Sequence, residues 1–190
     1  METYKYEKIR NVAVLGHGGA GKTTLVEAMA YTTGITTRQG KVEEGNTISD
    51  YDKEETKRLF SINMSVVPII WEDTKINFLD TPGYFDFVGE VEEAVGACDA
   101  AVIVVSGKKG VEVGTRKAWD LCEKYKIPRM FFVTDMMKLF LPSMVDNKQG
   151  KILNIGSTGS YISCPYDAVY AATKSYILSV SKGISSELKG

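Results

Sequence analysis

The N-terminal part of the chain contains the run Gly16-His17-Gly18-Gly19-Ala20-Gly21-Lys22-Thr23, which continues into Thr24. An apolar run at 12–15 precedes it, and a helix-like run at 25–31 follows. The spacing G-x-x-x-x-G-K-[ST] between a strand and a helix is that of a phosphate-binding loop. Its glycines let backbone N–H groups curl around an anion, and the helix adds its own unpaired N–H groups. The sequence therefore predicts a nucleotide site at 16–24.

The last two residues of the pattern have separate predicted roles. Lys22 would reach the outer phosphates, and the Thr23 hydroxyl would bind a Mg²⁺ that bridges them. The alternative is a glycine-rich turn with no ligand, which the complete spacing and its context disfavour.

Composition bounds the remaining possibilities. The chain has 190 residues, 44% of them apolar, which suits one α/β domain. Its net charge of −1 gives no electrostatic reason to expect a nucleic-acid partner, so none is expected. No apolar run reaches the roughly 18 residues of a membrane span, so no membrane association is expected. The three cysteines, Cys98, Cys122 and Cys164, are widely spaced and predict free thiols in a cytoplasmic protein.

Hydrophobic periodicity predicts the order strand, helix, hairpin, helix, strand, helix, strand. The expected strands are 11–15, 62–71, 75–79, 100–105 and 129–134, and the expected helices are 22–33, 87–98 and 115–125. Between them, residues 34–60 show no clear periodicity. A stretch of this length without structure is either functional or a solvated insertion, and the pattern alone leaves both open.

The run Asp80-Thr81-Pro82-Gly83 follows the strand at 75–79. Paired with the phosphate loop, it resembles the translational GTPases, and the flanking sequence resembles the G domain of elongation factor G over about residues 8–134. The resemblance implies that Asp80 holds Mg²⁺ through water and that the Gly83 N–H contacts the γ-phosphate. It also implies that 34–61 is a switch segment, with Ser61 in the place of the family's Mg²⁺-binding threonine.

Two positions depart from that family. Tyr84 stands where most members carry the histidine that positions the attacking water, and a phenol is a poor base at neutral pH. Lys138 stands where the family has the aspartate that accepts two hydrogen bonds from guanine, with Asp135 in the preceding asparagine place. Lysine has donors only. The sequence therefore predicts retained phosphate binding with weak or no hydrolysis and impaired guanine selectivity.

The last third of the chain resembles a different family. Ser157 follows a strand-like run, and Tyr170 and Lys174 form a Tyr-x-x-x-Lys pair, an arrangement similar to short-chain dehydrogenases. A serine-rich turn leading into a surface helix is the alternative. That family's dinucleotide-binding turn is missing, so no NAD(P) cofactor and no dehydrogenase activity are expected, and the three residues would be vestigial. Its last helices often pair subunits, which suggests a homodimer through 166–188.

Two families in one chain suggest an engineered or recombined chimera. The predicted architecture is one hybrid domain over 1–190, made of a GTPase-like portion at 1–135 and a dehydrogenase-like portion at 136–190. It is a three-layer α/β/α sandwich whose six-stranded, mostly parallel sheet has the order 2-3-1-4-5-6. Strand 2 is antiparallel and 152–155 is the sixth strand.

Three functions compete on this sequence. The leading one is binding of a GDP- or GTP-type nucleotide with Mg²⁺. The others are a folded chimera without ligand or activity, and an NAD(P)H reductase that rests only on the serine, tyrosine and lysine of the last third.

Overall fold

The computed structural model describes residues 4–134 and residue 182. The chain divides into two units, and the first, Met1–Phe140, contains the elements described below. The strands are β1 Ile9–Gly16, β2 Ser65–Trp71, β3 Thr74–Asp80, β4 Ala100–Ser106 and β5 Arg129–Thr134. The helices are α1 Lys22–Thr32, α2 Lys53–Arg58, α3 Val88–Ala97 and α4 Val113–Lys124. Short 3-10 turns lie at Tyr6–Lys8, Val42–Glu44 and Phe85–Phe87.

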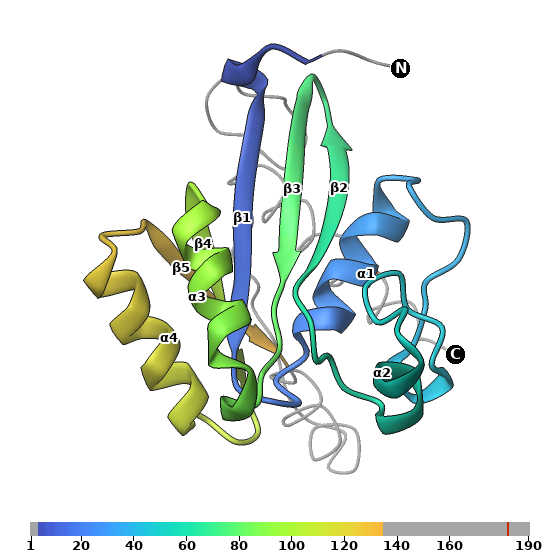
Figure 1. Ribbon diagram of the computed structural model, residues 1–190. Coiled ribbons are helices and arrows are strands. Elements are labelled where there is room, and N and C mark those ends of the chain that lie inside the picture. The colour runs from blue at the N-terminus through green and yellow to red at the C-terminus, as the bar shows by residue number, and fades with distance from the viewer. Residues whose placement is uncertain (1–3, 135–181, 183–190) are drawn as a thin grey trace. The chain divides into compact units, whose positions relative to one another are not determined.

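Within the described residues, the strands form one sheet in the order β2-β3-β1-β4-β5 (Figure 1). β1 runs parallel to both β3 and β4, and β4 runs parallel to β5. β2 is antiparallel to β3, to which a tight turn connects it. The predicted order of the first five strands and the antiparallel second strand are confirmed. The predicted sixth strand at 152–155 lies outside the described residues.

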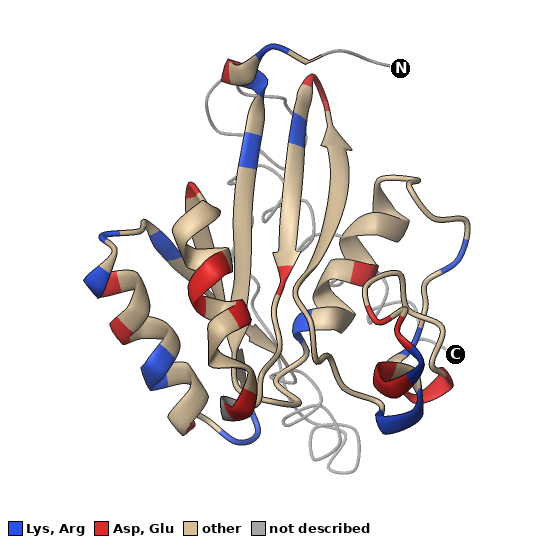
Figure 2. Ribbon diagram, viewed as in Figure 1, with Lys and Arg blue, Asp and Glu red and all other residues tan. Residues whose placement is uncertain are grey.

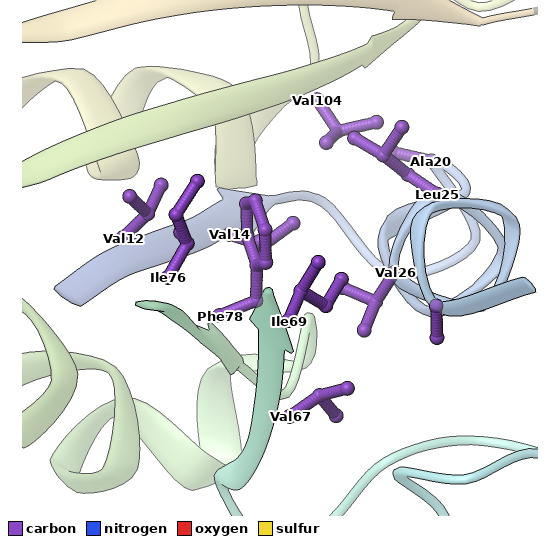
Figure 3. Close-up of a cluster of buried hydrophobic side chains, with 11 residues drawn as sticks. Val12, Val14, Ala20, Leu25, Val26, Val67, Ile69, Ile76, Phe78 and Val104 are labelled. Atoms are coloured by element: carbon purple, nitrogen blue, oxygen red, sulfur yellow. The ribbon is translucent and has the colours of Figure 1, made fainter. Parts of the chain in front are cut away.

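The core has two halves because β1 is buried on both faces, as a central parallel strand should be. Val12 and Val14 face α1, whereas Ala13 and Leu15 face α3 and α4. Figure 3 shows the first half, in which side chains of α1 interleave with those of β1, β2 and β3. Helices therefore cover both sides of the sheet, and the predicted three layers are confirmed.

The segment 34–60 is more ordered than its lack of periodicity indicated. It contains the turn Val42–Glu44 and the helix α2, around which charges of both signs gather (Figure 2). α2 begins with a capping box: Asp52 accepts the Glu54 N–H at 2.7 Å, and Glu55 accepts the Asp52 N–H at 3.2 Å. This local signal, an acidic residue at the cap and another three positions later, was present in the sequence.

No helix in the described part of the chain is long and apolar enough to cross a bilayer.

Candidate functional site

The phosphate loop joins β1 to α1 at the end of the sheet where the parallel strands have their carboxyl ends. Gly16, with φ of 143°, passes so close to β4 that an added Cβ would lie 2.4 Å from the Val104 carbonyl oxygen. Gly19 and Gly21 also have positive φ, and Gly21 is the N-cap of α1. Only glycine combines this backbone with this packing, so the loop's shape follows from its composition.

Lys22, the first residue of α1, lies in the mouth of this loop. Its side chain is buried, and its Nζ donates to the carbonyl oxygens of Gly16 at 3.2 Å and His17 at 3.1 Å. Burial lowers the pKa of Lys22 to about 8, although the carboxylates of Asp80 and Asp50 act in the opposite direction. The group therefore remains largely protonated at neutral pH and is available to an anion.

Oxygen-bearing side chains from separate elements meet next to Lys22. The Thr23 and Ser61 hydroxyl oxygens are 3.3 Å apart, and the Ser49 hydroxyl donates to Asp80 Oδ2 at 2.7 Å. Asp80 Oδ1 is buried without a hydrogen-bond partner. Burial raises the pKa of Asp80 to about 6, whereas the Ser49 hydrogen bond and the charge of Lys22 lower it.

Asp50 and Ser49 are site residues that the sequence analysis missed. Asp50 is 4% exposed, its Oδ1 is buried without a partner, and burial raises the pKa of its carboxyl group. No local pattern marks either residue, because both lie in the segment that lacks periodicity. Only the three-dimensional path of 34–61 brings them beside Asp80.

The loop, the segment 34–61 and the turn after β3 enclose one cleft of about 240 Å³. Its lining residues are Gly18, Gly19, Gly21, Lys22, Thr23, Thr24, Val42, Glu43, Asp50, Leu59, Phe60, Ser61, Gly83 and Tyr84. A cation, glycine backbone, and acidic and hydroxyl oxygens line the cleft together. Such a site suits an anion together with a hard cation.

The donor set fits Mg²⁺ in chemical type. Hydroxyl and carboxylate oxygens are the ligands that this ion takes, and Oδ1 of Asp80 and Oδ1 of Asp50 are buried without a hydrogen bond. Residues 4–134 contain no group of three or more His, Cys, Asp or Glu side chains that could hold a metal by themselves. The protein would thus supply few ligands, as Mg²⁺ sites with phosphate and water ligands do.

The other predicted loop residues occupy different surroundings. His17 Nδ1 accepts the Gly114 N–H at 3.3 Å, and its Nε2 lies 3.5 Å from a carboxylate oxygen of Glu112, so this side chain contacts the start of α4. Ala20 is buried in the core against α1 and the sheet. Thr24 lines the cleft.

Gly83 and Tyr84 close the cleft from the turn after β3. A Cβ on Gly83 would lie 2.5 Å from Lys22 Nζ and 2.6 Å from Gly18, so this backbone packs directly on the phosphate loop. The Tyr84 ring covers Gly18, where an added Cβ would be 3.1 Å from it. The ring centroids of Tyr84 and Phe60 are 4.8 Å apart. An aromatic pair therefore borders the predicted position of the outer phosphate.

The remaining predicted site residues lie outside the described range. These are Asp135 and Lys138 of the base-binding position, the vestigial set Ser157, Tyr170 and Lys174, and the pairing helix at 166–188.

Comparison with known proteins places this geometry in a family. Residues 7–163 match the family described as the Elongation factor Tu GTP binding domain. The chain is 45% identical over 129 residues to a mitochondrial ribosome-releasing factor 2 of Drosophila melanogaster, a match that covers 68% of the chain and 17% of that protein. It is 38% identical over 136 residues to elongation factor G of Granulibacter bethesdensis, covering 72% of the chain and 20% of that protein.

Solved structures agree. A crystal structure of a Thermus thermophilus protein superposes with a TM-score of 0.67 at 42% identity, over 74% of this chain and 22% of that one. A bacterial selenocysteine-specific elongation factor superposes with a TM-score of 0.59 over 96% of this chain and 29% of that one. At 19% identity, that second likeness shows the fold alone.

The expectation of no nucleic-acid partner is wrong. Relatives are named as ribosome-releasing and elongation factors, and the ribosome is a nucleic-acid assembly. The net charge was a poor guide to partners, because 23 basic and 24 acidic residues cancel in the sum. A sum near zero does not show how the charges are distributed over the surface. The matched region is also only 17–20% of these relatives' length.

Two further expectations lack support from the comparisons. The family match extends to residue 163, past the expected change of family at 134–138, and it gives no sign of a chimera or of engineering. The cytoplasmic location stays a prediction, and the Drosophila relative is named as mitochondrial.

The chain spans about a fifth of the length of the curated relatives it matches. Its phosphate loop, its Asp80–Gly83 turn and the match over 7–163 agree, and the chain belongs to the family of elongation factor Tu GTP-binding domains.

Proposed function

We propose that this domain binds GDP or GTP together with Mg²⁺ in the cleft beside the phosphate loop. The observation that carries the proposal is the meeting of Lys22, Thr23, Ser61 and Asp80 in one place, from three separate parts of the chain. A buried ammonium in a glycine loop, next to acceptors without partners, suits a phosphate–Mg²⁺ pair.

Each residue has a proposed task. Backbone N–H groups of 16–24 surround the phosphates, and Lys22 contacts the outer ones. The Thr23 and Ser61 hydroxyls would hold the metal, Asp80 would act on it through water, and the Gly83 N–H would contact the γ-phosphate. When bound, Mg²⁺ supplies positive charge that stabilises the phosphate oxygens.

We infer that hydrolysis is weak. Tyr84 occupies the place of the water-positioning histidine, and its ring rests on Gly18 beside Phe60. A phenol is a poor acceptor of a proton from water at neutral pH, and the aromatic pair makes the adjacent surface apolar.

We also infer that guanine selectivity is reduced. The support comes from the sequence, in which Lys138 stands in the place of the guanine-binding aspartate. A hydrogen bond to a charged group contributes about 1.5–3 kcal/mol, so loss of two weakens guanine preference by about two or more orders of magnitude.

Titration with fluorescent GDP, GTP and ATP analogues, with and without Mg²⁺, tests the proposal. The wild type should bind in a Mg²⁺-dependent, saturable way, with GDP and ATP affinities closer than in a guanine-selective protein. Lys22→Ala should lose at least about a hundredfold in affinity, because a buried charged contact to phosphate is removed. Lys57→Ala, at an exposed lysine of α2, is the matched control and should bind like the wild type. Equal binding by wild type and Lys22→Ala would refute the proposed site.

We further propose that 136–190 is the dehydrogenase-like portion of one hybrid domain over 1–190, and that it binds no NAD(P). Its support is the spacing of Ser157, Tyr170 and Lys174, whereas the family match to residue 163 counts against it. A rise in melting temperature with NADPH, lost in Tyr170→Phe, would contradict the absence of cofactor binding.

For the whole protein, we propose an action at the ribosome, supported by the names of its relatives. Co-sedimentation with ribosomes in the presence of a non-hydrolysable GTP analogue tests this. The wild type should sediment with ribosomes only when the nucleotide analogue is present, and Lys22→Ala should not sediment with them. Equal sedimentation with and without the analogue, in both proteins, would contradict the proposal.

A further inference from the structure

Glu27 is a buried carboxylate that the nucleotide site does not use directly. It lies on α1, five residues after Lys22, and its side chain is 1% exposed. Its Oε2 accepts the Gly40 N–H at 2.8 Å, and its Oε1 accepts the Ile48 N–H. Both partners belong to the segment 34–61, 13 and 21 residues away along the chain.

Such a contact constrains the segment strongly. A buried carboxylate is costly unless hydrogen-bonded, and charge-assisted hydrogen bonds are about twice as strong as neutral ones. Any path of the segment that removed its N–H groups from Glu27 would leave the charge buried without these partners. The carboxylate therefore favours one path of the backbone over others.

The chain between the two contacts forms a closed turn. The Lys41 N–H donates to Asn46 Oδ1 at 2.7 Å, and Gly45 turns the backbone with φ of 59°. At Gly40 an added Cβ would lie 2.6 Å from the Asn46 carbonyl oxygen and 2.9 Å from Glu27 Oε2. Only glycine allows the backbone to approach the carboxylate this closely.

The residues after Ile48 are those that enter the site. Ser49 donates to Asp80 at 2.7 Å, and Asp50 lines the cleft with a buried, unpartnered oxygen. Glu27 thus accepts a hydrogen bond from Ile48, the residue directly before Ser49 and Asp50. The same helix carries Lys22 and Thr23 in its first turn, so one rigid element holds both halves of the site.

We propose that Glu27 is a positioning residue that holds 40–48 against α1 and thereby presents Ser49 and Asp50 to the Mg²⁺–nucleotide site. The consequence for ligand binding rests on the proposed function, whereas the effect on the segment does not. Glu55 makes a similar contact further along, accepting the Ile62 and Asn63 N–H groups at 2.9 Å each. That second anchor holds the Ser61 end, so loss of Glu27 should loosen only the first part of the segment.

The test uses two variants and one control in the full chain. Glu27→Gln places an amide NH₂ against one of the two backbone N–H groups. Gly40→Ala disturbs the same contact from the other side without changing α1. Glu90→Gln is the control, because Glu90 also accepts a backbone N–H, that of Met64 at 2.7 Å, on the other side of the sheet from α1.

Two measurements are made on each variant. Amide hydrogen exchange measures how often the backbone of 40–50 opens. Titration of fluorescent GDP in the presence of Mg²⁺ or of EDTA measures the affinity of the site for nucleotide. Both variants should exchange faster at 40–50 and lose about tenfold in affinity with Mg²⁺, but less than about twofold in EDTA. The Glu90→Gln control should show neither faster exchange at 40–50 nor a loss of affinity.

Unchanged exchange at 40–50 in both variants would overturn the inference. So would an equal loss of affinity with and without Mg²⁺, because that would mean general damage to α1. If the wild type binds no nucleotide, the proposed function fails, but hydrogen exchange still decides whether Glu27 holds the segment. A Glu27→Gln protein that does not fold would leave the decision to Gly40→Ala.

Discussion

The phosphate loop and the segment 34–61 line the same cleft, but different interactions maintain their shapes. The loop's path depends on backbone conformations that only glycine adopts easily, at Gly16, Gly19 and Gly21. The segment's path depends on two buried carboxylates, Glu27 and Glu55, which accept backbone N–H groups from it and from the residues that follow it. The loop's shape depends first on its own glycines, whereas the segment's shape depends on side-chain contacts with residues distant in the chain.

This difference predicts how each region tolerates change. The loop is bounded by backbone atoms of β1 and β4, which cannot move without disturbing the sheet. The segment is bounded mainly by side-chain contacts, which can exchange for water one at a time. Substitutions that strain the backbone of the loop should therefore lower the free energy of unfolding more than similar substitutions in the segment.

The largest expected effect is that of Gly16→Ala. A Cβ there would lie 2.4 Å from the Val104 carbonyl oxygen at a φ of 143°, so both strain and a clash with backbone arise. We expect a loss of about 3 kcal/mol or more in the free energy of unfolding, measured by denaturant titration.

The counterpart in the segment is Gly45→Ala. Its φ is 59°, but the nearest atom, the Thr56 carbonyl oxygen, would be 3.4 Å from the new Cβ. The expected loss is about 1 kcal/mol, from backbone strain alone. Gly96→Ala in α3, where nothing lies within 4 Å, is the control and should be neutral or stabilising. Equal losses at positions 16 and 45 would contradict the proposed difference between the regions.

The same difference explains what could be predicted from the sequence. The loop and the strands β1, β3, β4 and β5 were predictable because a contiguous pattern or apolar run determines each. The path of 34–61 was not, because Glu27 gives no sign in the sequence of the two N–H groups that it will meet. Only the Asp52–Glu55 capping box was a local signal, and it marked the start of α2.

Asp80 lies where the two regions meet, next to Lys22 of the loop side and Ser49 of the segment. Asp80→Asn should remove most of the Mg²⁺-dependent part of nucleotide affinity, about a hundredfold, because the anionic oxygens are lost. Binding in EDTA should change little. Isothermal titration with and without Mg²⁺ measures this, and a variant that keeps its full Mg²⁺ dependence would refute the assigned role.

Asp80→Asn should weaken nucleotide binding but increase the stability of the folded protein without ligand. The pKa of Asp80 in the folded protein is raised to about 6, so the folded state binds its proton more tightly than the unfolded state does. This contribution is present below the usual carboxyl pKa and is lost as the pH rises through about 6. Without ligand, Asp80→Asn should therefore be more stable than the wild type at pH 7.5, by about 3 kcal/mol, and nearly equal at about pH 4. Thermal melting at both pH values checks the sign.

Tyr84 joins the regions in another way, since its ring contacts Gly18 of the loop and Phe60 of the segment. Tyr84→His would supply a base that titrates near neutral pH, and we expect single-turnover GTP hydrolysis to rise at least about tenfold. Tyr84→Phe keeps the ring and should leave the slow rate unchanged. A faster Tyr84→Phe variant would mean that the phenol hydroxyl itself suppresses hydrolysis.

The smallest expected effect belongs to Ser49→Ala, which removes the hydrogen bond that the Ser49 hydroxyl donates to Asp80 Oδ2. That bond lowers the pKa of Asp80, so its loss should raise the pKa further and shift the midpoint of Mg²⁺-dependent nucleotide binding to higher pH. At pH 7 the affinity should fall about threefold to tenfold, in line with a net hydrogen-bond contribution of about 1 kcal/mol. Ser65→Ala is a matched control, because its hydroxyl donates at 2.6 Å to the carbonyl oxygen of Ser49 and not to the carboxylate. An unshifted midpoint in Ser49→Ala would mean that the Ser49 hydroxyl does not set the pKa of Asp80 in the binding reaction.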